Sequence, residues 1–348
     1  PNRARGESAT RVGDLPLYFL NRDTQVGHHP GHHTMSRPSS LDVRCGRVPS
    51  ALLFAAAALV AASAPTRSAL AQSGNESMFV SVLDSAGAPV PRLTTTDFIV
   101  EEDGAEREIL DVRPARAPMQ VAVLVDTSAS VTHATSDLRR GLETLVGRLS
   151  EGNELALVTF GGTPRILVES TARLDRLRAG INQVFPASNS AAYLLDALVE
   201  TARGFEHRES ARPVIIAITG EGLDYSNRDA RQVLDALKDS RTAAHMIVLR
   251  GGRTLAFNAD PTTFGVSDGR ERDMVLDQGP LASGGQRHDV MMSARLGTTL
   301  DEIAVVILNQ YEVVYSRPTS LIPPEAITVR MRREDFSARG TPVRRAGG

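Results

Sequence analysis

Apolar and polar residues change their spacing near residue 119, which divides the chain into a β-rich region and an α/β region. Before that point, short stretches of alternating apolar and polar residues predict strands at 78–83, 98–102 and 107–112. Asp103-Gly104 is typical of a hairpin turn between the last two of these strands. We therefore expect a small β domain over residues 77–116, with residues 114–118 as the linker that leaves it.

Beyond residue 119, uninterrupted apolar runs alternate with stretches of helical spacing. Runs such as Gln120–Val125 and Val214–Thr219 are typical of strands that are buried on both faces of a sheet. Further strands are expected at 155–160, 165–168 and 244–249, and helices at 138–149, 174–184, 191–202, 229–238 and 296–308. This alternation predicts an α/β fold with a doubly wound, mostly parallel sheet over residues 119–309.

The remaining segments are less regular. Residues 252–285 are rich in Gly, Pro, Asp and Arg, and we interpret them as one long loop with room for a short helix. Closing strands are expected at 311–316 and 326–332, within a C-terminal region, 310–348, of strands and a basic tail. The tail from Asp335 is expected to fray.

The N-terminal region has the features of processing segments. Residues 1–34 precede Met35 and are interpreted as a non-native or untranslated leader, so their four histidines are not taken as a metal site. Residues 35–71 have the features of a signal peptide, with arginines, an apolar core at 51–62 and an Ala-Leu-Ala site before Gln72. The apolar core is too short for a comfortable membrane span, which disfavours the alternative of a membrane anchor. We expect export, to the periplasm or outside the cell, and no stable membrane insertion after cleavage.

The composition of the chain argues against several classes of partner and binding site. The formal net charge is -2 and there is no Trp, so nothing favours nucleic acid as a partner. The sequence contains no phosphate-binding loop ending in Gly-Lys-Ser/Thr. Cys45 is the only cysteine and precedes the expected cleavage site, so disulfides play no part in the prediction.

A compact polar motif follows the first buried strand. Asp126, Ser128 and Ser130 come directly after Gln120–Val125, at the carboxyl edge where open α/β sheets present ligand groups. One carboxylate and two hydroxyl groups are hard oxygen ligands that suit Mg²⁺ or Mn²⁺. An acidic residue of a protein partner can then fill an open coordination position. The alternative is structural, because Asp126 and the serines can also satisfy backbone groups of the loop.

With this motif at the end of an apolar strand, the chain resembles a von Willebrand factor type A (VWA) domain. It is similar in particular to exported bacterial VWA-related proteins, through Leu93-x-x-x-Asp97-Phe98-x-x-x-Glu102-Asp103-Gly104 before the motif and Gln310-Tyr311-x-x-x-Tyr315 after the last helix. The resemblance spans residues 77–345. It implies the family fold, a metal-ion-dependent adhesion site (MIDAS), and a role in binding or cell adhesion.

The sequence departs from the family pattern at two of five site positions. The family's metal-binding threonine aligns with Ala192, and Ser190 is the candidate substitute. The family's second acidic residue, in an Asp-Gly pair, is replaced by Gly220-Glu221-Gly222, which makes Glu221 the candidate. The predicted metal ligands are therefore Asp126, Ser128, Ser130, Ser190 and Glu221.

These observations predict a non-enzymatic binding protein with a macromolecular, protein partner. The alternative is a metal-independent structural module of the cell envelope. An enzymatic alternative rests on Gly265-Val266-Ser267-Asp268-Gly269, a nucleophile-elbow pattern followed by Asp273 and His288. An elbow needs a strand before the serine and a helix after it, and the residues before Ser267 do not have the pattern of a strand.

Overall fold

In the computed structural model, the described residues belong to one unit of the chain. The described residues are 73–187, 190–222, 224–251, 266–318 and 322–343. The predicted leader, signal peptide and cleavage site lie outside them. Within the described ranges, no helix is both long enough and apolar enough to cross a membrane.

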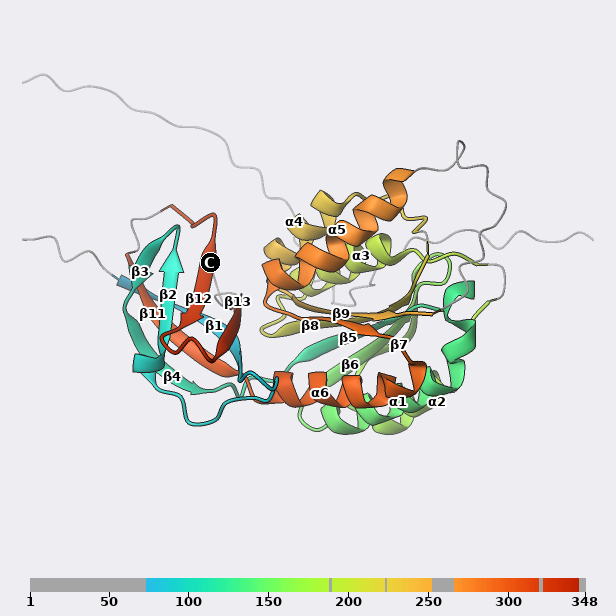
Figure 1. The fold of residues 1–348 in the computed structure, drawn as a ribbon, viewed down its shortest axis with the longest axis horizontal. Helices are drawn as coiled ribbons and strands as arrows, with labels where there is room; N and C mark the ends of the chain where they lie inside the picture. Colours follow the sequence, from blue (N-terminus) through green and yellow to red (C-terminus); the bar gives the residue numbers. More distant parts are fainter. Residues whose placement is uncertain (1–72, 188–189, 223, 252–265, 319–321, 344–348) are drawn as a thin grey trace, which may run out of the picture. The chain divides into compact units, whose positions relative to one another are not determined.

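A six-stranded sheet forms the centre of the α/β region, in the order β10-β9-β8-β5-β6-β7 (Figure 1). Its strands are β5 (Gln120–Val125), β6 (Glu154–Thr159), β7 (Arg165–Thr171), β8 (Pro213–Gly220), β9 (Ala243–Leu249) and β10 (Arg287–Val290). The strands are parallel except β7, which pairs with β6 as an antiparallel hairpin partner. The predicted α/β fold with a mostly parallel sheet is confirmed.

Helices cover both faces of this sheet because the central strands are apolar on both sides. In β5, Val121, Val123 and Val125 belong to one core cluster, and Ala122 and Leu124 belong to the other. The first cluster includes side chains of α1 (Thr135–Leu149), α2 (Leu174–Ile181) and α6 (Leu296–Leu308). The second includes those of α3 (Leu194–His207), α4 (Ala230–Ser240) and α5 (Val266–Ser283). Figure 1 shows the two helical layers on opposite sides of the sheet.

The 18-residue helix α5 corrects the prediction of a long loop over 252–285. Its buried positions recur every three or four residues, as a packed helix requires. These positions are Arg272, Val275, Leu276, Gly279, Pro280 and Ser283. Only Val275 and Leu276 are large and apolar, so the inward stripe has no hydrophobic pattern in the sequence. Residues 252–265 lie outside the described residues.

The N-terminal and C-terminal strands form one β region rather than two separate ones. β1 (Ser73–Leu83) lies between β11 (Tyr311–Pro318) and β13 (Ser337–Pro342), and β4 (Ile109–Pro114) pairs with β11. A second sheet contains β12 (Ile327–Met331), β2 (Phe98–Glu102) and β3 (Ala105–Arg107). Side chains of both sheets, including those of Met78, Phe98 and Val313, form one core cluster.

Two further predictions in this region are corrected. The strand predicted at 107–112 is divided, because β3 pairs with β2 while β4 pairs with β11 in the other sheet. The tail predicted to fray from Asp335 contains β13, whose backbone pairs with β1 from Met78 to Leu83. The partners of β4 and β13 are β11 and β1, which are distant in sequence, so local patterns do not reveal these pairings.

Candidate functional site

The candidate site is built on Asp126, which follows β5 at the carboxyl edge of the sheet. Its carboxylate is buried and accepts hydrogen bonds from both neighbouring segments. The amide of Ser128 donates to Oδ1 at 2.7 Å, while the amide of Gly220 and the hydroxyl of Thr219 donate to Oδ2 at 3.0 and 3.1 Å. The carboxylate therefore joins the loop after β5 to the end of β8.

The two serine hydroxyl groups of the motif lie side by side. Ser128 Oγ and Ser130 Oγ are 2.8 Å apart, and Ser130 Oγ also donates to Asp126 Oδ2 at 3.3 Å. Ser128 is the N-cap of the short 3-10 helix η2 (Ala129–Ala134) that leads into α1. The structure thus brings together three of the five predicted ligands, Asp126, Ser128 and Ser130.

The structure does not bring Ser190 to this cluster. Its hydroxyl donates to Ala187 O at 3.0 Å and to Thr127 O at 3.4 Å, and its carbonyl accepts from the amide of Ala129 at 3.1 Å. Ser190 therefore fixes the loop that precedes α3. Ala192 forms a β-bridge with Asp224, and for this reason α3 begins at Leu194 rather than at the predicted residue 191.

Glu221 is also turned to other partners. Its carboxylate pairs with Arg250 Nη1 at 2.9 Å and accepts from the amide of Gly251 at 2.9 Å. The hydrogen bond from Arg250 is the main cause of a lowered pKa of the Glu221 carboxyl, and the amide of Gly251 adds to it. Arg250 in turn pairs with Asp289 at 2.8 Å, so Glu221 belongs to an ion-pair network at the ends of β9 and β10.

Two buried charged residues at the same edge have no counterpart in the sequence prediction. Arg272 of α5 donates through Nη2 to Thr219 Oγ1 at 3.3 Å and, in a short contact, to Gly220 O. Asp224 accepts at 2.7 Å from the amide of Leu194, in the first turn of α3, and at 3.0 Å from the amide of Ser226. Burial raises the pKa of the Asp224 carboxyl, and it also lowers the pKa of the Arg272 guanidinium.

The donor set does not fit a divalent cation. An octahedral ion with ligands at about 2.1 Å places adjacent ligands about 3 Å apart, a spacing that Ser128 Oγ, Ser130 Oγ and Asp126 Oδ2 approach. The two other predicted ligands, Ser190 and Glu221, are bonded to other partners, so the set is incomplete. Gly220 occupies the acidic position, and an added Cβ there would lie 2.3 Å from Ser130 Oγ. The buried guanidinium of Arg272 lies at Thr219 and Gly220, and its positive charge disfavours the binding of a metal cation nearby.

The close approach of Gly161 to the motif gives a first prediction. A Cβ at Gly161 would lie 2.1 Å from the carbonyl carbon of Thr127 and 2.3 Å from the amide nitrogen of Ser128. We expect Gly161→Ala to displace the motif backbone and lower the free energy of unfolding by about 2–3 kcal/mol, as overpacking does. Urea unfolding followed by circular dichroism measures this change.

The matched control for Gly161 is Gly147, in the last turn of α1, where an added Cβ meets nothing within 4 Å. Gly147→Ala should raise the free energy of unfolding by about 0.5–1 kcal/mol, because alanine favours the helix. Equal stability of the two variants would show that the motif tolerates a side chain at position 161.

The nucleophile-elbow pattern is not assembled as a catalytic unit by the described contacts. Residues 266–269 lie in α5, and Gly265 is outside the described residues. Asp273 is exposed on α5, whereas His288 lies in β10 with Nε2 3.4 Å from Gln286 Oε1. Within the described ranges, no hydrogen bond joins Asp273 to His288.

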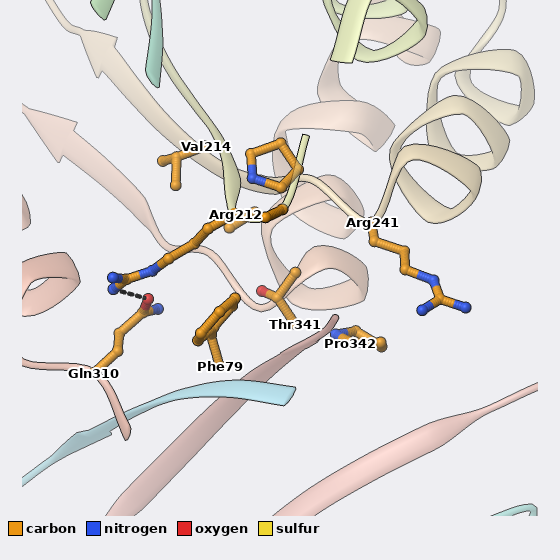
Figure 2. Close-up of a pocket in the computed structure, with 10 residues that line it drawn as sticks. Phe79, Arg212, Val214, Arg241, Gln310, Thr341 and Pro342 are labelled. Carbon is orange, nitrogen blue, oxygen red and sulfur yellow. Dashed lines mark hydrogen bonds between the residues drawn. The ribbon is translucent and has the colours of Figure 1, made fainter. Parts of the chain in front are cut away.

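A small pocket lies at the opposite, amino end of the sheet (Figure 2). Its wall contains Pro213 and Ala243, which begin β8 and β9, with Phe79 of β1 and Thr341 of β13. Arg212 crosses this wall and reaches Gln310 (Figure 2). Because Arg212 is buried and bonded to its surroundings, this pocket is a packing junction rather than part of the site at Asp126.

Comparisons with known proteins support the same region. Residues 121–223 match the sequence profile of the von Willebrand factor type A domain. The matched span runs from β5 to the end of β8 and contains Asp126, Ser128, Ser130 and Gly220. A search of curated proteins found no match.

Several solved structures are similar to this chain at low identity. An aerotolerance-related membrane protein from Bacteroides fragilis NCTC 9343 is 15% identical, with a TM-score of 0.40, covering 53% of this chain and 98% of that chain. A von Willebrand factor type A protein from Catenulispora acidiphila is 10% identical, with a TM-score of 0.43, covering 78% and 74%. Proximal thread matrix protein 1 from the mussel byssus, described with a zinc-occupied MIDAS motif, is 13% identical, with a TM-score of 0.44, covering 60% and 49%.

Proposed function

Because residues 121–223 match the profile of the von Willebrand factor type A domain, we propose that this chain is an exported binding protein of that kind, which recognises a protein partner at the carboxyl edge of its six-stranded sheet. Domains of this family are generally non-enzymatic modules that bind other proteins. The export part of the proposal is supported by the signal-peptide pattern of residues 35–71. Release to the periplasm or outside the cell follows from that pattern.

The observation that carries the proposal is a set of large exposed apolar side chains in loops at this edge. Phe185, Tyr225 and Met291 are 65%, 36% and 74% exposed. The loop of Phe185 is joined to the motif by the amide of Ala187, which donates to Thr127 O at 2.8 Å. The amide of Tyr225 donates to Ala192 O at 2.9 Å, in the same loop as Ser190. Met291 directly follows β10, next to the Arg250 network.

These residue types are the ones that protein interfaces prefer. Aromatic residues and Met are enriched at interfaces, and a few of them carry most of the binding energy. Phe185 is also held in place, because the Arg139 guanidinium lies 3.9 Å from the centre of its ring. A fixed aromatic side chain loses little conformational entropy when a partner covers it.

The metal-bridged form of recognition predicted from the sequence, with Mg²⁺ or Mn²⁺ and an acidic residue of the partner, is the competing mechanism. It requires the ion that the donor set at Asp126 does not fit. We therefore propose direct contact between the edge loops and the partner. The two mechanisms differ in their response to a chelator.

Capture of a partner from cell-envelope extract by the purified chain tests the proposal. We expect Phe185→Ser and Met291→Ser each to reduce capture at least tenfold, as the loss of interface anchors does. Leu110→Ser is the control, since Leu110 is an exposed apolar residue of β4, away from the edge loops. EDTA should leave capture by the wild-type chain unchanged.

Two results would contradict this function. Equal loss of capture in all three variants, or in none, would show that the partner does not use the carboxyl edge. Loss of capture in EDTA that is restored by Mg²⁺ or Mn²⁺ would establish the metal-bridged mechanism instead.

A further inference from the structure

Arg272 brings a permanent positive charge to the end of β8, beside the Asp126 motif. The guanidinium is 5% exposed and comes from α5, which the sequence did not predict. It donates to Thr219 Oγ1, and Thr219 Oγ1 donates to Asp126 Oδ2 at 3.1 Å. One hydroxyl group therefore stands between the arginine and the carboxylate of the motif.

Three carboxylates and one further guanidinium act on the charge of Arg272. Asp126 and Asp224 are both buried, and both attract Arg272 through the low-dielectric interior. Asp273, on the exposed side of α5, pairs with Arg272 Nη1 at 3.6 Å, while Arg250 repels it. Without Arg272, Asp126 would be a buried carboxylate near no other buried cation among these groups. Such a charge is strongly destabilising when it loses its counter-charge.

Gly220 also cannot supply a metal ligand. Its carbonyl oxygen accepts a hydrogen bond from Arg272 in a short contact, and glycine has no side chain that could coordinate an ion. Ser130 fills the space in front of Gly220, where a Cβ would meet its hydroxyl. The arginine and the glycine thus act together, because an acidic side chain at position 220 would need the space that the present arrangement fills.

We propose that Arg272 is the built-in cation of this site: its guanidinium neutralises Asp126 in place of a divalent metal, so that the carboxyl edge keeps its shape and recognises a partner without a metal ion. Only the recognition clause rests on the proposed function. The replacement of the metal by an arginine is a property of the chain alone and is tested without a partner.

Binding of Mn²⁺, followed by electron paramagnetic resonance and by calorimetric titration, is the direct test. We expect the wild-type chain to show no saturable Mn²⁺ binding up to millimolar concentration, and the same melting temperature with and without EDTA. Saturable binding by the wild-type chain that Asp126→Ala abolishes would overturn the proposal, and this arm needs no change at Arg272.

A charge cycle tests the pairing itself. Arg272→Met keeps most of the volume of the side chain but removes its charge, and it should lower the melting temperature. Adding Asp126→Asn removes the uncompensated carboxylate and should restore at least half of that loss. Arg272→Lys keeps a point charge and should lose less than Arg272→Met. Arg270→Met, an exposed arginine of the same helix, is the matched control and should leave the melting temperature unchanged.

The cycle has a clear contrary result. If the losses from Arg272→Met and Asp126→Asn simply add, the two side chains are not paired and the proposal is overturned. None of these measurements uses a partner, so a failure of the capture experiment leaves them intact. Conversely, metal-independent folding of the site does not by itself establish capture.

Discussion

Replacing Arg212 with alanine should lower the free energy of unfolding by about 3–5 kcal/mol, because it leaves several buried acceptors without donors. The guanidinium donates to Ala117 O at 3.1 Å, to Ile307 O at 2.6 Å and to Gln310 Oε1 at 2.8 Å. The Cζ atom of Arg212 also lies 4.9 Å from the centre of the Phe79 ring (Figure 2). The Arg212 side chain thus donates hydrogen bonds to acceptors near the end of α6, in the linker after β4 and in the residue before β11.

The charge and the shape of the Arg212 guanidinium together make lysine a poor substitute. Burial lowers this pKa to about 10, so the guanidinium stays charged at neutral pH even in a dry position. A lysine offers a single point charge without the planar fork that reaches three acceptors. We expect Arg212→Lys to recover less than half of the stability lost in Arg212→Ala.

Urea unfolding at pH 7.5 measures both variants. Arg176→Ala is the control, because Arg176 is exposed on α2 and should change the free energy of unfolding by less than about 0.5 kcal/mol. A loss below about 1 kcal/mol in Arg212→Ala would mean that water replaces the guanidinium, and that the junction is more open than its contacts indicate.

Sequence-based prediction succeeded for elements whose buried faces are apolar and failed for a helix whose buried face is mostly polar or small. The strands β5, β8 and β9 are buried on both faces, so their apolar runs are unbroken and their positions were predicted correctly. Helices α1 and α6 have an apolar stripe that the sequence displays directly. Helix α5 was missed because its inward positions include an arginine, a glycine, a proline and a serine.

The site divides in the same way. Asp126, Ser128 and Ser130 lie within one turn, so their proximity follows from the sequence alone. Arg272 reaches the end of β8 from α5, which packs against α4 and β9, and a helix that is not predicted cannot contribute a predicted side chain. The sequence contains one indication of this difference, Gly220, which stands where the family pattern has an acidic residue.

His245 gives the second prediction of large effect. It lies in β9, fully buried, and within the described part of the chain neither ring nitrogen has a hydrogen-bond partner. Burial is the main cause that lowers its pKa to about 3, and the positive charges that His288 and Arg339 bring nearby add to the effect. The folded chain therefore holds this imidazole neutral at pH values where a free histidine takes up a proton.

The sign of the pH dependence follows from this difference. An unfolded chain binds a proton at His245 with a pKa of about 6.5, whereas the folded chain binds it only near pH 3. The pKa is depressed by folding, so the associated stability is fully present above pH 6.5 and is lost as the pH falls. Between these two pKa values, the free energy of unfolding should fall by about 1.4 kcal/mol per pH unit through this one group.

His245→Leu should remove this dependence and raise stability at neutral pH, because it replaces two unsatisfied buried nitrogens with an apolar group. Urea unfolding at pH 7.5, 6.0 and 5.0, for the variant and the wild-type chain, measures the difference in slope. Taking this difference removes the contributions of His288 and the carboxylates, which both chains share. His133→Leu, at an exposed position before α1, is the control for the removal of a histidine. Equal slopes in His245→Leu and the wild-type chain would mean that the buried imidazole is protonated or solvated in the folded state, and that β9 is less tightly enclosed than its burial indicates.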